Sequence, residues 1–365
     1  MKYFSILLKP ASSLCNMRCR YCFYCDVAEN REVFSYGIMN EATAAALLDR
    51  VFTYLTPPAT VTFAFQGGEP TVAGLDFFKM FTALADQKNE ERFILQYAIQ
   101  TNGLTIDRDW CKLLKKYDFL VGLSLDPGGK LHVAHRLDGK KNGTFSRVRK
   151  TAQLLEETGV SYNILSTVTR QMAQHPQEVF RFYKNSGFRY IQLTPCLKAL
   201  DAEENAPFDL TPRLFASFLK QFFALWYQSL REGDYISVRM FDNLVRQFRG
   251  EPAEQCGMSG ECTPQFVVEG DGSVFPCDFY VLDPYKSGNV NENTVEEIGK
   301  SEGMLQFVRD QKPRPPICDS CRFLPICGGG CRRYRDFYHE EEGYCPYADF
   351  LSEAAPVLVQ LARMS

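Results

Sequence analysis

The stretch Cys15-Asn-Met-Arg-Cys19-Arg-Tyr-Cys22-Phe-Tyr places three cysteines at the spacing C-x3-C-x2-C. A four-iron cluster is usually held by four cysteine thiolates. Three thiolates from one loop, with no obvious fourth, leave one iron open to bind a substrate or cofactor. This spacing therefore indicates chemistry at an open iron rather than simple electron storage. Zinc also binds clustered thiolates, so a zinc site is the alternative at this point.

Most of the other cysteines lie in the last third of the chain. The sequence has fourteen cysteines, and eight of them form two groups there: Cys256, Cys262 and Cys277, then Cys318, Cys321, Cys327, Cys331 and Cys345. Eight thiolates are enough for two fully ligated four-iron clusters. A zinc-ribbon or treble-clef fold is the alternative use of the same residues. Cys25, Cys111 and Cys196 remain as free thiols, which are usually small buried apolar residues.

Length and composition exclude several classes of protein. A chain of 365 residues, 45% of them hydrophobic, can bury a large core without disulfides. No apolar run approaches the length of a membrane span, and residues 4–8 are too short for the core of an export signal. We therefore expect a cytoplasmic protein with reduced thiols, in an anaerobic setting that suits iron–sulfur chemistry.

The charge pattern gives no sign of a nucleic-acid surface, because the net charge is −3 and no basic patch stands out. Two short basic pairs do occur, Lys140-Lys141 and Arg332-Arg333. We expect both pairs to be solvated surface or to contact an acidic partner.

Short β-rich runs alternate with helical stretches over the first two-thirds of the chain. Six strands are expected, at residues 4–9, 60–66, 93–100, 119–125, 161–167 and 190–195. Helices are expected at 40–54, 75–88, 107–117, 144–158 and 175–186, then at 212–231, 238–248 and 347–362, with a hairpin over 265–275. This alternation implies a parallel sheet flanked by helices. Periodicity alone does not separate a barrel from an open sheet.

Polar or glycine-rich segments follow several of the expected strands. They are Gly67-Gly68-Glu69-Pro70, Thr101-Asn102, Ser124-Leu-Asp126 and Gln192-Leu193. Ligands of parallel α/β folds bind at the carboxyl ends of the strands. Glycines allow a ligand to approach the backbone closely, and Glu69 offers a carboxylate to an ammonium group. A plain turn between strand and helix is the alternative for each segment.

The three-cysteine loop resembles the signature of the radical S-adenosylmethionine (SAM) enzymes. The resemblance implies a partial (β/α)6 TIM-like barrel in which SAM chelates the open iron of a cluster held by Cys15, Cys19 and Cys22. An electron from that cluster would cleave SAM to methionine and a 5′-deoxyadenosyl radical. By the same resemblance, the residues that contact SAM are Phe23, Tyr24, Gly67, Gly68, Glu69, Asn102, Ser124, Arg136 and Leu193.

The C-terminal cysteine pattern resembles the SPASM domain, which carries two auxiliary clusters. The resemblance implies three [4Fe–4S] clusters in all. It also implies a radical SAM barrel over residues 1–235, a helical linker over 236–250 and a SPASM domain over 251–365, with the eight C-terminal cysteines as ligands of the auxiliary clusters.

Further segments resemble the anaerobic sulfatase-maturating enzymes: Tyr21-Cys-Phe-Tyr24, Ser35-Tyr-Gly-Ile-Met39, Phe65-Gln-Gly-Gly-Glu-Pro70 and Cys277-Asp-Phe-Tyr280. The resemblance covers essentially the whole chain. It implies an oxidoreductase that converts a cysteine or serine of a sulfatase to Cα-formylglycine, with Asp278 as the general base. Tyr24 and Gln66 would border the target side chain, and a reduced flavodoxin- or ferredoxin-type protein would donate electrons.

Two other functions stay open at the level of sequence. A maturase of ribosomally made peptides would form thioether or carbon–carbon crosslinks in a precursor peptide with the same fold and clusters. A non-enzymatic iron–sulfur or zinc protein would leave the open-iron cysteine triplet and the Gly67-Gly-Glu-Pro70 segment unexplained.

Overall fold

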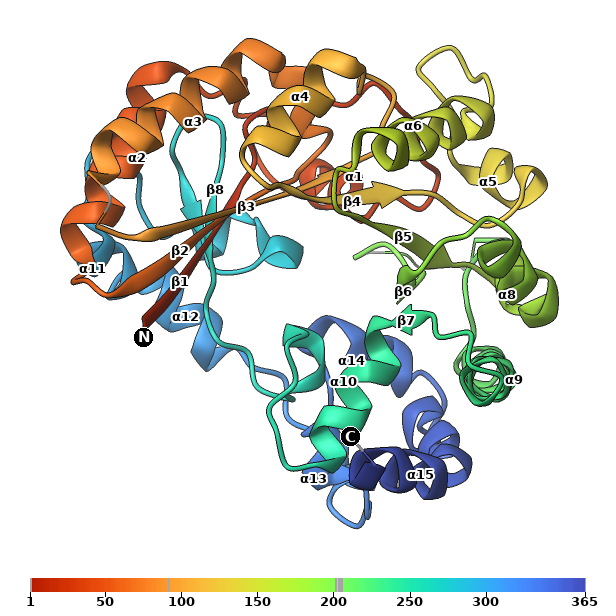
Figure 1. The fold of residues 1–365 in the computed structure, drawn as a ribbon. Helices are drawn as coiled ribbons and strands as arrows, with labels where there is room; N and C mark the ends of the chain where they lie inside the picture. The colour runs from red at the N-terminus through yellow and green to blue at the C-terminus, as the bar shows by residue number, and fades with distance from the viewer. Residues whose placement is uncertain (1, 91, 201, 203–205, 365) are drawn as a thin grey trace. The chain divides into compact units, whose positions relative to one another are not determined.

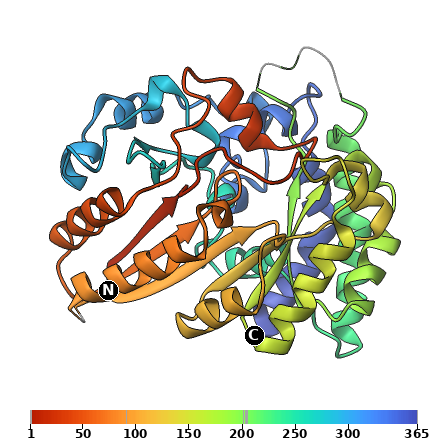
Figure 2. The ribbon, with the colours of Figure 1, turned by 90° about the horizontal axis from the view of Figure 1, so that it is seen from above.

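The computed structural model describes residues 2–90, 92–200, 202 and 206–364 (Figure 1). The strands are β1 (Lys2–Leu8), β2 (Ala59–Phe65), β3 (Ile94–Thr101), β4 (Leu120–Ser124), β5 (Tyr162–Val168), β6 (Tyr190–Pro195), β7 (Ser237–Val238), β8 (Phe266–Val268) and β9 (Val274–Phe275). Parallel pairs join β1 to β2, β2 to β3, β3 to β4 and β5 to β6, and Figure 2 shows β1, β2 and β3 side by side. The six expected strands and the parallel α/β fold are therefore confirmed.

Helices follow the strands in alternation. They are α1 (Phe23–Glu29), α2 (Glu41–Tyr54), α3 (Leu75–Asn89), α4 (Arg108–Lys116), α5 (Gly129–His135), α6 (Phe145–Thr158), α7 (Arg170–Ala173), α8 (Pro176–Asn185), α9 (Pro212–Arg231), α10 (Arg239–Phe248), α11 (Val295–Gly299), α12 (Glu302–Arg309), α13 (Leu324–Cys327), α14 (Arg332–Tyr338) and α15 (Pro346–Met364). Short 3₁₀ helices cover Pro70–Ala73, Cys256–Met258, Asp278–Tyr280, Asp283–Tyr285 and Pro316–Cys318. All eight expected helices are present; the short helices α1, α5, α7 and α11 to α14 were not predicted.

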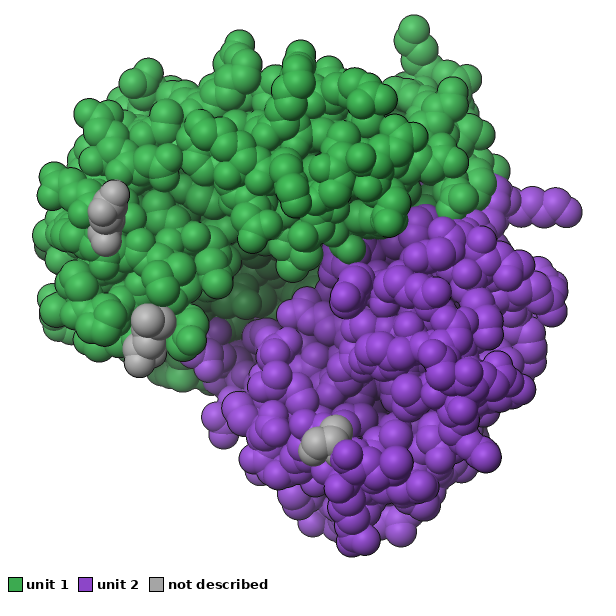
Figure 3. Space-filling model, viewed as in Figure 1, with its two compact units in different colours: residues 1–125, 133–162, 264–310 green, residues 126–132, 163–263, 311–365 purple. Residues whose placement is uncertain are grey.

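The chain divides into two compact units (Figure 3). Unit 1 comprises residues 1–125, 133–162 and 264–310, and unit 2 comprises residues 126–132, 163–263 and 311–365. Hydrogen-bonded strands follow the order β4-β3-β2-β1-β8-β9 in unit 1 and β7-β6-β5 in unit 2. Each unit thus combines segments of the N-terminal two-thirds with segments of the cysteine-rich third.

The core of unit 1 is rich in aromatic side chains. Alternate residues of a strand face the same side, and Phe63 and Phe65 of β2 both point into this core. The Phe63 ring lies 5.2 Å from that of Phe81 on α3, and the Phe65 ring 4.9 Å from that of Phe78. Helices α2, α3 and α4 cover this face of the strands (Figure 1). Burial of large rings stabilises the sheet that positions the strand ends.

The β8–β9 hairpin extends the sheet of unit 1 beyond β1. Strand β8 pairs in parallel with β1, Ile6 opposite Phe266, and β9 pairs antiparallel with β8. The sequence predicted the hairpin but not its pairing with the first strand, which lies some 260 residues away. This pairing brings the segment that follows β9, which contains Cys277 and Asp278, close to the carboxyl-terminal half of β1.

Unit 2 buries aromatic residues between its long helices. The Phe223 ring of α9 lies 5.7 Å from that of Phe350 on α15, and Trp226 Nε1 donates a 2.8 Å hydrogen bond to the Ile236 carbonyl. No helix among the residues that the structure describes is long and apolar enough to span a membrane.

The expectation that Arg332-Arg333 is a solvated surface pair is wrong. Both residues are buried in unit 2, and Arg333 Nη2 donates to the Lys198 carbonyl. Nearby Arg335 donates to three further carbonyls, including a 2.7 Å bond to Gly260 O. Loop-rich structure leaves many carbonyls without helix or sheet partners, and guanidinium groups supply the donors.

Candidate active site

The three-cysteine loop connects β1 to α1, and two of its sulfur atoms accept hydrogen bonds from backbone amides. Cys15 Sγ accepts a 3.3 Å hydrogen bond from Met17 N, and Cys22 Sγ accepts one of 3.4 Å from Cys25 N at the start of α1. Burial, together with the charges of Glu69, Cys19 and Cys22, raises the pKa of Cys15 to about 12. A thiolate here therefore requires a bound cation, as the irons of a cluster provide.

Gly67 and Gly68 pack directly against this loop. Gly68 N donates to Ser12 O at 2.7 Å, and Glu69 N donates to Leu14 O at 2.9 Å. A Cβ atom on Gly68 would lie 2.3 Å from Leu14 O, and Gly67 has a φ of +124°. Only glycine fits at these two positions, which explains why a glycine pair follows β2.

The Glu69 carboxylate is buried and joins the ends of β2 and β3. Its Oε1 accepts bonds from the Thr71 hydroxyl at 2.6 Å and the Thr101 hydroxyl at 2.7 Å, and from Thr71 N at 3.1 Å. Its Oε2 accepts a 2.6 Å bond from Asn102 N. Burial raises the pKa of Glu69, and these hydrogen bonds oppose that rise. Three donors fill Oε1, so Oε2 is the oxygen with room for an ammonium group.

Other expected SAM contacts lie around the same loop. Asn102 Nδ2 donates to Asn16 Oδ1 at 2.7 Å and lies 3.8 Å from Cys15 Sγ. The buried guanidinium of Arg136 lies 5.4 Å from the centre of the Tyr21 ring. Ser124 is the last residue of β4. The structure thus brings Glu69, Asn102 and Arg136 to the three-cysteine loop, whereas Leu193 belongs to unit 2.

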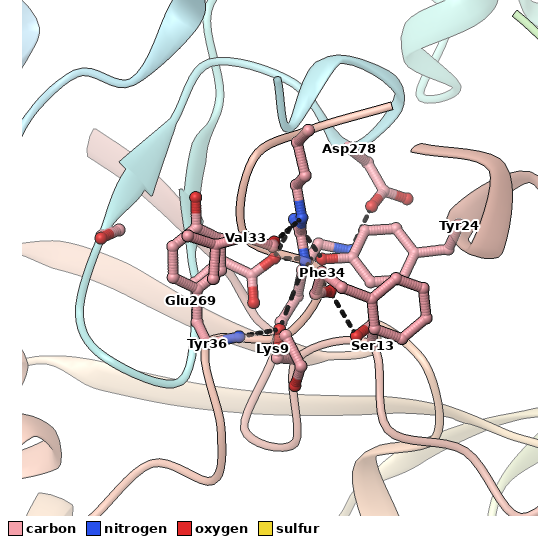
Figure 4. A network of polar contacts seen from close by, with 12 residues as sticks. Lys9, Ser13, Tyr24, Val33, Phe34, Tyr36, Glu269 and Asp278 are labelled. Carbon is pink, nitrogen blue, oxygen red and sulfur yellow. Dashed lines mark hydrogen bonds and ion pairs between the residues drawn. The ribbon is translucent and has the colours of Figure 1, made fainter. Parts of the chain in front are cut away.

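Asp278 meets two residues from the ends of β1 and β2. Its Oδ1 lies 2.5 Å from Lys9 Nζ (Figure 4). Its Oδ2 accepts a 2.7 Å hydrogen bond from Gln66 Nε2. The Lys9 side chain is 0% exposed and that of Asp278 is 17% exposed. Lys9 follows β1 and Gln66 follows β2, so both stand at strand ends. The carboxylate is therefore fixed through both oxygens and still reaches solvent.

Tyr24 covers the ammonium group of Lys9. The centre of its ring lies 3.6 Å from Lys9 Nζ, a cation–π contact. The Tyr24 hydroxyl is bonded to Glu269 Oε1 and lies 3.3 Å from Arg31 Nη1 (Figure 4). Burial, followed by the charge of Glu269, raises the pKa of Tyr24 well above its usual value, so this hydroxyl donates to the carboxylate. Phe23, the preceding residue, packs its ring 4.9 Å from that of Phe279.

Arg31 and Glu269 form a buried ion pair that supports Tyr24. Arg31 Nη1 lies 3.0 Å from Glu269 Oε1, and both side chains are 0% exposed. The same guanidinium donates to Val33 O at 2.8 Å and to Phe34 O at 2.9 Å. These bonds shape residues 31–36, and bonds from Ser13 Oγ to Phe34 O and from Tyr36 N to Ser12 Oγ hold the segment against the cysteine loop.

Lys9, Arg31 and Glu269 were not singled out from the sequence. Lys9 could have been found, because it follows a strand as the other expected site residues do. No such pattern marks Arg31 and Glu269, because the two residues of this ion pair are 238 positions apart in the sequence.

Four cysteines of unit 2 line one cavity. They are Cys318, Cys321, Cys327 and Cys345, and Leu193, Met240 and Met258 add apolar walls. Burial, together with the charges of the other three thiols, raises the pKa of Cys327 to about 11. This apolar cavity with four thiols fits a four-iron cluster.

The other C-terminal cysteines form a second group. Burial raises the pKa of Cys331, and the charges of Cys262 and Cys256 add to the rise, so these three thiols of unit 2 lie close together. Cys277 belongs to unit 1. Among the described residues, no three His, Cys, Asp or Glu side chains converge as they would on a single metal ion.

The three remaining cysteines differ from one another. Cys111 and Cys196 are buried, as expected. Cys25 is only half-buried, with its Sγ 3.5 Å from Glu29 Oε1.

Two family models match the chain: the Radical SAM superfamily over residues 10–183 and SPASM, an iron–sulfur cluster-binding domain, over residues 256–322. The chain is therefore a radical SAM enzyme with a SPASM domain. It is 40% identical over 337 residues to the cysteine-type anaerobic sulfatase-maturating enzyme of Clostridium novyi, covering 92% of this chain and 90% of that protein. The chain belongs to the anaerobic sulfatase-maturating enzymes.

Two further comparisons agree with this membership. The serine-type anaerobic sulfatase-maturating enzyme of Bacteroides thetaiotaomicron is 26% identical, covering 95% of this chain and 91% of that protein. The solved structure of native anSMEcpe with bound AdoMet and Cp18Cys peptide superposes with a TM-score of 0.91 at 37% identity, and the match covers 99% of both chains. The family, fold and enzyme class predicted from the sequence are confirmed.

Proposed function

We propose that this protein oxidises a cysteine or serine side chain of a sulfatase to Cα-formylglycine, with Asp278 as the acceptor of the target's thiol or hydroxyl proton. The observation that carries this proposal is the fixed Asp278 carboxylate, held by Lys9 and Gln66 at the ends of β1 and β2. The AdoMet- and peptide-bound anSMEcpe structure supports it by family relationship.

Three clusters fit the cysteines present. Cys15, Cys19 and Cys22 would hold the cluster with an open iron. One auxiliary cluster would be held by Cys318, Cys321, Cys327 and Cys345, and Cys256, Cys262 and Cys331 would be ligands of the other. When bound, the clusters and SAM supply one-electron transfer and a radical that removes a hydrogen atom. A reduced flavodoxin- or ferredoxin-type protein would supply the electrons.

The chain's own residues would orient SAM. Glu69 Oε2 has room for an ammonium group, and the Arg136 guanidinium suits a carboxylate. Gly67 and Gly68 allow the backbone to approach closely. The pairing of β2 and β3 fixes Glu69 beside Asn102, so these two contacts act as one rigid unit.

Asp278 has the geometry of a positioned base. Lys9 occupies one lone pair of Oδ1 and Gln66 one of Oδ2, which leaves each oxygen able to accept from a further donor. Tyr24 closes the other side of the Lys9 ammonium, so Lys9 cannot swing away from the carboxylate without losing the ring contact. The target hydroxyl or thiol would donate to the exposed edge of Asp278, with Tyr24 and Gln66 as its neighbours.

We further propose cysteine as the preferred target. The chain is 40% identical to a cysteine-type relative and 26% identical to a serine-type relative. The test is anaerobic incubation of the reconstituted enzyme with SAM, dithionite and a sulfatase-derived peptide that carries cysteine, serine or alanine at the target position.

Mass spectrometry of the peptide should show replacement of the thiol by an aldehyde, a slower reaction with serine and none with alanine. An internal crosslink in place of the aldehyde would contradict the proposal and indicate a peptide maturase.

A further inference from the structure

Four exposed cationic side chains lie in the three-cysteine loop and in a segment bonded to it. Arg18 and Arg20 lie in the loop itself, and Lys140 and Lys141 lie in the segment before α6; we name these four residues the basic surface. The two segments are joined by backbone hydrogen bonds, from Arg18 N to Leu137 O at 2.7 Å and from Gly139 N to Asn16 O at 3.2 Å. All four residues therefore belong to one region of unit 1.

The positive charge of this surface is not neutralised locally. None of its four side chains forms an ion pair within the part of the chain that the structure describes. Asp138, the acidic residue of the segment, is 16% exposed, and its oxygens accept from Lys140 N, Asn142 N and Arg147 Nη1. Arg147 offsets the charge of Asp138, so Asp138 does not pair with the four cationic side chains of the basic surface.

The basic surface lies against the backbone that carries the cluster cysteines. Arg18 Nη1 donates to Cys15 O and to Met17 O, each at 2.8 Å. Arg20 N, between Cys19 and Cys22, donates a 3.1 Å hydrogen bond to His135 O. A protein seated here would contact the loop of Cys15, Cys19 and Cys22 itself. The loop between α5 and α6, which holds Lys140 and Lys141, projects outward (Figure 1).

We propose that the basic surface is the docking site of a small acidic redox protein, of flavodoxin or ferredoxin type, that reduces the cluster at Cys15, Cys19 and Cys22. This inference rests on the proposed function, which requires electrons from outside the enzyme. Each encounter passes one electron: the donor is oxidised by one electron, the cluster is reduced by one, and no bond is made or broken. Opposite charges on the two partners accelerate and orient such an encounter.

The test compares a protein reductant with a small one. In K140E/K141E the basic surface loses its charge without change to any residue assigned to SAM, to the clusters or to Asp278. The matched control is K115E/K116E, which reverses an exposed lysine pair on α4 of the same unit. Aldehyde formation is measured with reduced flavodoxin and, separately, with dithionite.

We expect K140E/K141E to lower the flavodoxin-supported rate by about 10-fold or more at low salt, with the dithionite-supported rate unchanged. The control should keep both rates. In the wild type, raising the ionic strength from about 0.01 M to about 0.15 M should slow the flavodoxin reaction but not the dithionite reaction.

Equal flavodoxin-supported rates in the K140E/K141E and K115E/K116E variants would overturn the docking proposal. So would an equal loss with dithionite, which would place the defect in the enzyme itself. Absence of aldehyde in the wild type with dithionite would instead overturn the proposed function, so the two failures are distinguishable.

Discussion

Replacement of Lys9 by methionine removes a single charge from beside Asp278. The Lys9 side chain is 0% exposed, with its Nζ 2.5 Å from Asp278 Oδ1 and 3.6 Å from the centre of the Tyr24 ring. Methionine is unbranched and of similar length, so it can fill the same space with an apolar chain. The substitution therefore isolates the contribution of the ammonium group.

The expected effect follows from the contact that is lost. A hydrogen bond to a charged group contributes about 1.5–3 kcal/mol, which corresponds to about 10- to 150-fold in rate if all of it orients the base in the transition state. Water can replace part of the contact, because the Asp278 side chain is 17% exposed. We expect a loss of about 10-fold in aldehyde formation. Asp278→Asn removes the group that takes up the proton and should lower the rate of aldehyde formation by about 10²-fold or more.

The assay measures both products of the reaction under anaerobic conditions with dithionite. Aldehyde is quantified by mass spectrometry of the peptide, and 5′-deoxyadenosine by chromatography. In Lys9→Met, 5′-deoxyadenosine should still form, while the ratio of aldehyde to 5′-deoxyadenosine falls. The loss should appear mainly in the kcat of aldehyde formation, with a smaller change in KM for the peptide. Lys9→Arg, which keeps the charge, should recover part of the coupling. Lys79→Met is the control, because Lys79 pairs with Asp76 at the surface.

One result would refute this reasoning directly: a wild-type ratio of aldehyde to deoxyadenosine in Lys9→Met, alongside a lost ratio in Asp278→Asn. Lys9 would then only fill space. Parallel loss of both products would also contradict it, since Lys9 would then act on SAM cleavage rather than on Asp278.

Three further predictions test other parts of the site. The anaerobic protein should hold about twelve irons, and the variant with Cys15, Cys19 and Cys22 all changed to Ala about eight, without SAM cleavage; zinc at the C-terminal cysteines, found by metal analysis, would contradict this. Arg31→Met should lower the free energy of unfolding by about 3–5 kcal/mol because it leaves Glu269 buried and unpaired, whereas Arg108→Met at an exposed pair should change it by at most about 1 kcal/mol in the same urea titration. Gly68→Ala should abolish SAM binding, because its Cβ would lie 2.3 Å from Leu14 O, while Gly139→Ala, with no atom within 4 Å of the added Cβ, should bind SAM normally in equilibrium dialysis.

Local patterns in the sequence determined the class of this protein and most of its elements. Cluster ligands from one loop lie close together in the chain, so the spacing of Cys15, Cys19 and Cys22 can be recognised from the sequence alone. The expected helix over 212–231 matches α9 (Pro212–Arg231), and Asn40 caps α2 as expected, its Oδ1 accepting from Thr43 N at 2.8 Å. Helix α1 was missed because it is short and its cap is a cysteine.

Only the tertiary structure decided which side chains meet. Lys9 and Asp278 are 269 residues apart, and they come together because β8 pairs in parallel with β1. The structure likewise shows that Arg333, expected at the surface, is buried and donates a hydrogen bond to the Lys198 carbonyl. Periodicity reports which face of an element is apolar, but it does not encode the partner of that face. The choice of neighbouring strand is a property of the whole folded chain, and it is this choice that places an ammonium group against the carboxylate of Asp278.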